Sequence, residues 1–128
     1  MSVRRDAGSS TVEFTLVSVL LVGLFLAVLQ LGFVLHTRNV LIASAQEGAR
    51  YAANADRGPV DALDRTRAVV ATALSDTVAD RMSYDAQEVV REGLLTVEVT
   101  VRGPLPLVFL PAGPMSITVR GHALEESR

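Results

Sequence analysis

Hydrophobic and polar positions divide this chain of 128 residues into two unlike parts. Residues 14–35 form a run of 22 with 17 apolar side chains and no charge. All the charged side chains lie outside this run, among the mixed positions typical of an ordinary globular domain. A helix of 22 residues is about 33 Å long, and the hydrocarbon core of a bilayer is about 30 Å thick. The pattern therefore predicts one membrane-spanning helix over residues 14–35, attached to a small soluble head.

Two other interpretations of the apolar run are open. A buried core helix that is apolar on every side would need a much larger protein around it. A cleaved secretory signal would explain the segment Ala43-Ser44-Ala45, which resembles a signal peptidase site. However, the apolar part of a signal is typically about 7–15 residues long. Cleavage at that site would make Gln46 the first residue of the mature protein, which distinguishes this interpretation from an anchor.

The helix is expected to continue well past the membrane, because no proline interrupts residues 9–54. Within the span, Gly23 and Ala27 form a small-x-x-x-small pair that favours close helix packing, and Gln30 is an amide that requires a partner. Further along, Gly48 costs about 1 kcal/mol relative to Ala, which a close backbone approach beside Ala49 would justify. These residues predict either a face that packs against other subunits or, in the outer half, a face that packs on the protein's own sheet.

The head, residues 55–128, is predicted to be α+β. Gly58 and Pro59 end the first helix and begin a second one that extends to about Ser75. Alternating apolar and polar residues then predict strands over 87–91, 95–102 and 115–120, which would form a small antiparallel sheet covered by the helices. The expected fold class is therefore a long N-terminal helix, a short helix and a small antiparallel sheet.

An uncharged loop over residues 103–114 contains four of the five prolines, which argues against a central strand there. Its most apolar part is a possible contact surface, either tucked against the long helix or offered to a partner or to the bilayer surface. That part consists of Leu107, Val108, Phe109 and Leu110.

Composition excludes several classes of function. The net charge is −2 without a basic cluster, so direct nucleic-acid binding is unsupported. Absence of cysteine excludes disulfides and thiol catalysis, and the two histidines, His36 and His122, cannot form a metal site by themselves. No phosphate-binding or nucleophile motif is present. We therefore expect no enzyme activity, no metal, no cofactor and no small-molecule substrate.

The junction ahead of the apolar run carries the most informative chemistry. Glu13 directly precedes Phe14, at the membrane edge, where an unpaired charge costs several kcal/mol. One explanation is a capping box, with Ser10 as the N-cap and Glu13 three residues later. A second explanation is proteolysis after Gly8, because the new amine of Ser9 would lie four residues before Glu13. That pair could neutralise itself within one helix or between neighbouring subunits.

This junction resembles a type IV prepilin cleavage site: Gly8, four residues, then Glu13-Phe14 at the head of an apolar helix. A second segment at the right distance, Ala45-Gln46-Glu47-Gly48-Ala49-Arg50-Tyr51-Ala52-Ala53, is similar to the TadE-like family of the tight-adherence (Tad, or Flp) pilus system. Together the two motifs cover residues 8–53, about a third of the chain.

The resemblance implies a leader of residues 1–8, cleaved by a prepilin peptidase between Gly8 and Ser9. It implies an inner or plasma membrane anchor with a cytoplasmic N-terminus and an extracytoplasmic head. The protein would be a minor pilin or pseudopilin, and its partners would be other pilins and the Tad membrane assembly platform. The alternative is a single-pass anchored binding module that is not processed as a pilin.

Overall fold

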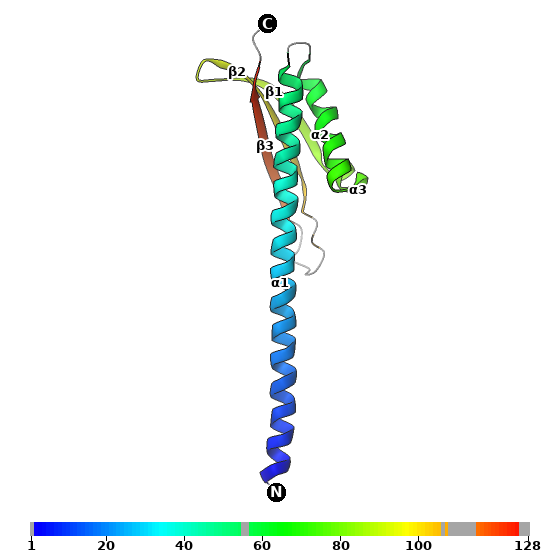
Figure 1. Cartoon of the computed structure of the whole chain (residues 1–128), viewed down its shortest axis with the longest axis vertical. Helices are drawn as coiled ribbons and strands as arrows, with labels where there is room; N and C mark the ends of the chain where they lie inside the picture. The colour runs from blue at the N-terminus through cyan, green and yellow to red at the C-terminus, as the bar shows by residue number, and fades with distance from the viewer. Residues whose placement is uncertain (1, 55–56, 106, 108–114, 126–128) are drawn as a thin grey trace.

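A computed structural model describes residues 2–54, 57–105, 107 and 115–125, with backbone only for residues 2–7. The helices are α1 (Ser2–Ala53), α2 (Pro59–Ala73) and α3 (Asp76–Arg81). The strands are β1 (Ser83–Arg91), β2 (Leu94–Pro104) and β3 (Ser116–Leu124). In Figure 1, α1 is a long rod, and every other element lies beside its C-terminal part. This arrangement confirms the predicted α+β class.

Helix α1 begins earlier than the sequence pattern indicated. It runs unbroken through Ser10, so the expected N-cap at Ser10 and its capping box with Glu13 are wrong. An N-cap must have non-helical backbone, whereas Ser10 continues a helix that starts at Ser2. The C-terminal end is close to the prediction, and Arg50 in the last turn suits the negative end of the helix dipole.

The predicted second helix is confirmed as α2, and a short third helix, α3, which the sequence pattern did not predict, follows it. Pro59 opens α2, and the Asp61 carboxylate accepts a hydrogen bond from the Gly58 N–H at 2.8 Å. The helix ends at Ala73 instead of continuing to Ser75, because the Ser75 hydroxyl accepts the Val78 N–H at 3.1 Å and starts α3. The Ser75 side chain thus favours a new helix start at this position over continuation of α2.

The described residues form a three-stranded antiparallel sheet in the order β1-β2-β3. A tight turn joins β1 to β2 through Glu92 and Gly93, whose φ angles of 53° and 82° are those that a two-residue hairpin requires. The predicted strand over 87–91 is the second half of β1, and β2 continues past the expected end to include Gly103 and Pro104.

The core lies between one face of the sheet and the C-terminal half of α1, with α2 alongside. Alternate residues of β2 are fully buried there, as the sequence pattern predicted; they are Val97, Val99 and Val101. A Cβ on Gly121 of β3 would collide with the backbone of Ala45 and Gln46. Helix α1 therefore rests directly on β3, and none of the described helices covers the opposite, polar face of the sheet.

Candidate functional site

The junction before the span is open on every side. Gly8, Ser9 and Glu13 are exposed on α1, and a Cβ placed on Gly8 would meet no atom within 4 Å. Ser9 and Glu13 are four residues apart on this helix, so they lie on the same face. None of the described side chains forms an ion pair with Glu13. The peptide bond after Gly8 is therefore accessible, and the carboxylate can take a partner.

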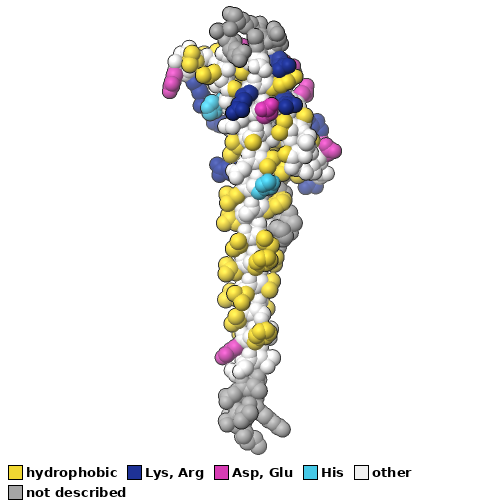
Figure 2. All heavy atoms as spheres, in the orientation of Figure 1, with side chains coloured by type: hydrophobic (Ala, Val, Ile, Leu, Met, Phe, Trp, Pro, Cys, Tyr) yellow, Lys and Arg dark blue, Asp and Glu magenta, His cyan; other side chains and the backbone are white. Residues whose placement is uncertain are grey.

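The span itself presents apolar side chains to its surroundings. Helix α1 from Gly8 to Ala53 is long and apolar enough to cross a membrane, and the chain buries almost none of its most apolar stretch. Phe14 and Leu20 are both more than half exposed. Figure 2 shows hydrophobic side chains along the lower half of the rod. A surface of this kind needs lipid or other helices around it.

The predicted packing residues divide between two environments. Gly23 and Ala27 are exposed on the span, and a Cβ on Gly23 would meet no atom within 4 Å, so both are available to another helix. Gln30 differs, because the chain itself buries it to 8% exposure.

Gly48 and Ala49 lie inside the head. A Cβ on Gly48 would collide with the Thr66 hydroxyl and lie 2.9 Å from the Ala62 carbonyl oxygen, both on α2. Ala49 is fully buried. Gly48 thus permits a close crossing of α1 and α2, so these two positions pack within the chain. At Gly48 the contact is with α2, whereas at Ala45 and Gln46 the outer half of α1 packs on the sheet, as expected.

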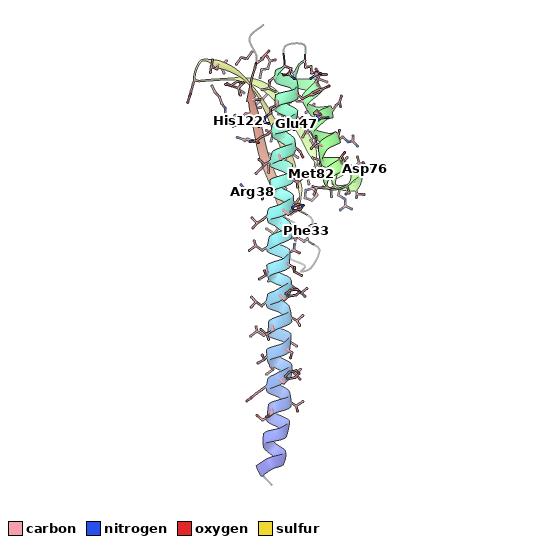
Figure 3. The ribbon with its side chains drawn as sticks, viewed as in Figure 1. Phe33, Arg38, Glu47, Asp76, Met82 and His122 are labelled. Carbon is pink, nitrogen blue, oxygen red and sulfur yellow. The ribbon has the colours of Figure 1, made fainter. Side chains whose placement is uncertain are left out.

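The segment Glu47–Tyr51 also joins α1 to α2 through polar groups. Arg65 of α2 donates to the Glu47 carboxylate at 3.2 Å, and the guanidinium of Arg57 lies 3.8 Å from the centre of the Tyr51 ring. Arg65 lies 5.6 Å from the same ring. Figure 3 shows Glu47 on the part of α1 that runs beside α2. Sequence reasoning missed this cluster, although the spacing of Glu47 and Tyr51 placed them on one helical face.

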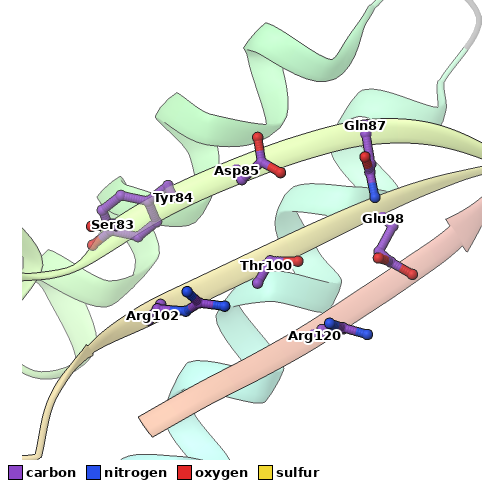
Figure 4. Close-up of a pocket in the computed structure, with 8 residues that line it drawn as sticks. All are labelled: Ser83, Tyr84, Asp85, Gln87, Glu98, Thr100, Arg102 and Arg120. Carbon is purple, nitrogen blue, oxygen red and sulfur yellow. The ribbon is translucent and has the colours of Figure 1, made fainter. Parts of the chain in front are cut away.

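The uncovered face of the sheet carries a groove with a volume of about 420 Å³. Pairing between strands places Asp85, Thr100 and Arg120 in one row across it, with Arg102 and Glu98 on either side of Thr100. Figure 4 shows Arg102 and Arg120 on neighbouring strands of this face. Glu98 is buried and accepts a hydrogen bond from Arg91 at 2.6 Å. The sequence pattern put Glu98, Thr100, Arg102 and Arg120 at the polar positions of their strands, but their alignment across the sheet, and the place of Asp85, depend on strand register.

Tyr84 fixes α3 against the sheet. Its hydroxyl donates to the Ala79 carbonyl oxygen at 2.8 Å, and Arg67 and Asp80 form an ion pair nearby. Burial raises the pKa of the Tyr84 hydroxyl above its ordinary value, while Arg67 lowers it and Asp80 raises it further.

The candidate contact loop is described only in part. Leu107 is partly buried, whereas Val108, Phe109 and Leu110 lie outside the described residues. The loop leaves the sheet where the Leu105 N–H donates to the Met115 carbonyl oxygen at 2.8 Å. Within the described part of the chain, no group of His, Asp and Glu side chains could hold a metal ion.

A long apolar helix that carries a small α+β head on its C-terminal half is the architecture of a single-pass, pilin-like protein. The family model described as "TadE-like protein" matches residues 8–50, from the open junction to the α1–α2 contact. This match confirms the resemblance seen in the sequence. No curated protein and no solved structure was found to match the chain. The match supports a pilin-like protein associated with the Tad pilus, and the TadE-like pilin family is structural and not enzymatic.

Proposed function

We propose that the protein is a minor pilin or pseudopilin of a Tad (Flp) pilus. The observation that carries the proposal is the single helix α1, which joins the exposed Gly8–Phe14 junction to the contact with α2 at Gly48, both within the TadE-like match over residues 8–50. A minor role is favoured because major Flp-type subunits are typically little more than the helix. In this chain, residues 55–128 add a folded head with its own core.

In this proposal a prepilin peptidase cuts between Gly8 and Ser9. The cut removes Arg4, Arg5 and Asp6 and creates a positive amine four residues before Glu13. Since an isolated charge at the membrane edge is costly, Glu13 pairs with that amine in its own helix or in the neighbouring subunit. Pairing between subunits would set their axial register.

Assembly then proceeds through the exposed span. Gly23 and Ala27 allow a second helix to approach closely, which is the main source of helix association in lipid, where the hydrophobic effect is weak. Before assembly, the N-terminus is cytoplasmic, the head is extracytoplasmic, and the partners are other pilins and the Tad assembly platform in the inner or plasma membrane.

The test is the intact mass of the membrane-bound protein, produced with and without its prepilin peptidase. We expect loss of residues 1–8 only when the peptidase is present, and no loss in the control variant Gly8→Val. A chain that keeps its original start in the presence of the peptidase would contradict the proposal. A chain that starts at Gln46 would instead support secretion.

A second candidate function is an anchored binding module that is never processed. The groove on the open face of the sheet favours it, because Arg102 and Arg120 lie there without an ion-pair partner among the described residues. The same mass measurement separates the two candidates, since this one predicts that the leader remains.

A further inference from the structure

We propose that the end of the head nearest the span is inserted into the surface layer of the bilayer that α1 crosses. Met115 would lie among the lipid chains, and Arg38 and Arg81 would lie at the phosphate headgroups. This inference rests on the membrane anchoring of α1 in the proposed function. It does not depend on cleavage after Gly8 or on incorporation into a pilus.

The height of the sheet along α1 follows from the packing of β3 on the helix. The contact of Gly121 with Ala45 and Gln46 fixes the position of β3 on the helix, and both elements run in the same direction (Figure 1). Ser116 precedes Gly121 by five residues, so it lies about 17 Å nearer the N-terminal end of α1. That distance equals about 11 residues of helix, which places Ser116 level with Leu35. The sheet thus reaches the predicted outer end of the span.

The described residues at this end of the head, Pro104, Leu105 and Met115, carry no charge. The hydrogen bond from Leu105 to Met115 continues the pairing of β2 with β3 one step closer to the span. The Met115 side chain is 48% exposed there. At the bilayer surface, an apolar, uncharged end is stabilised by contact with lipid, because its apolar area is removed from water.

Helix α1 is unevenly buried along the span. Most of the span is exposed, but one stripe is partly or fully covered: Leu26, Gln30, Phe33, Val34 and Thr37. Gln30 and Thr37 are buried, although both lie before Arg38 in the helix. The side of the span's last turns that carries Gln30 and Thr37 is therefore not the side exposed to lipid.

Two exposed arginines lie near this end of the head. Arg38 is exposed on α1 one turn beyond Leu35, and Arg81 ends α3, where it lines a small hollow with Pro104 and Leu105. Figure 3 shows Arg38 and Met82, the neighbour of Arg81, at similar heights along α1. Long basic side chains can lay their apolar stems on the chain and extend the charge to lipid phosphates.

The chain contains neither Trp nor Cys, so a single introduced Trp is a clean probe of depth. The full chain would be reconstituted in phosphatidylethanolamine–phosphatidylglycerol vesicles that contain lipids brominated on the acyl chain. Met115→Trp tests the inference, and Ser116→Trp provides a second position at the same end. The matched control is Leu124→Trp, which is 59% exposed at the opposite end of β3. Leu20→Trp, in the middle of the span, reports anchoring itself.

We expect brominated lipid to quench the fluorescence of Met115→Trp and Leu20→Trp and to leave Leu124→Trp unchanged. Water-soluble acrylamide should give the reverse order. If neither Met115→Trp nor Ser116→Trp is quenched while Leu20→Trp is, the head lies above the bilayer and the inference is wrong. If Leu20→Trp is also unquenched, membrane anchoring fails, and the proposed function fails with it.

Discussion

The backbone of Gly121 in β3 lies against the backbone of Ala45 in α1, with no room for a side chain between them. This contact joins the membrane helix to the sheet directly, so the head has no flexible stalk. Any force that moves α1 along its axis is therefore transmitted to β3. The same contact fixes the height of the head above the span.

Substitution of Gly121 by Val should destabilise the head strongly. Overpacking of a core typically costs about 1–3 kcal/mol, and here the obstacle is helix backbone, which cannot change rotamer. Denaturant unfolding of the chain in detergent, followed by near-ultraviolet circular dichroism, would measure the loss. Gly32→Ala is the control, because a Cβ there meets no atom within 4 Å. Equal stability of Gly121→Val and the wild type would contradict the contact.

Gly48→Ala should also destabilise the head, although alanine is the better helix former. The gain in helix propensity is about 1 kcal/mol, whereas the new Cβ meets the Thr66 hydroxyl and the Ala62 carbonyl oxygen. Adding Thr66→Ala should recover part of the loss, since it removes the hydroxyl. The free energies of unfolding of both variants would test this, and a more stable Gly48→Ala would show that α2 does not cross α1 so closely.

Glu13→Ala should leave cleavage after Gly8 intact and abolish assembly. The peptide bond is exposed on the helix and distinct from the carboxylate, whereas pairing with the amine of Ser9 needs the negative charge. Mass spectrometry would report cleavage, and co-purification with other pilins together with counts of surface pili would report assembly. Glu13→Asp is the matched control that keeps the charge. Normal piliation with Glu13→Ala would remove the pairing role.

Tyr84 should make the head sensitive to alkaline pH. Because its pKa is raised in the folded state, the folded protein holds the proton more tightly than the unfolded chain does. The stabilisation of the folded head by protonated Tyr84 is complete below the ordinary tyrosine pKa of about 10. It is lost as the pH rises through the raised pKa of Tyr84 in the folded protein. Ultraviolet titration should show a late tyrosinate step that Tyr84→Phe abolishes. At neutral pH, this variant should lose about 1 kcal/mol with the hydrogen bond to Ala79.

Local patterns were enough to predict the helix, the strands and the junction. The uncharged run of residues 14–35 has the length of a bilayer, and the alternation of Val97, Val99 and Val101 with polar residues is that of a half-buried strand. The N-cap at Ser10 was predicted wrongly, and the short helix α3, which Ser75 caps, was not predicted. In both places serine hydroxyls and helical continuation compete within about 1 kcal/mol, and sequence pattern cannot rank such small differences.

The sequence by itself determined that this chain has one long apolar helix, a small α+β head and a TadE-like segment ahead of that head. These features depend on residues close together in the chain, where spacing alone sets the geometry. Only the tertiary structure decided that Gly48 faces Thr66 and that Gly121 faces Ala45. Those contacts join residues far apart in sequence, and they depend on how closely two backbones can approach once the side chains between them are small.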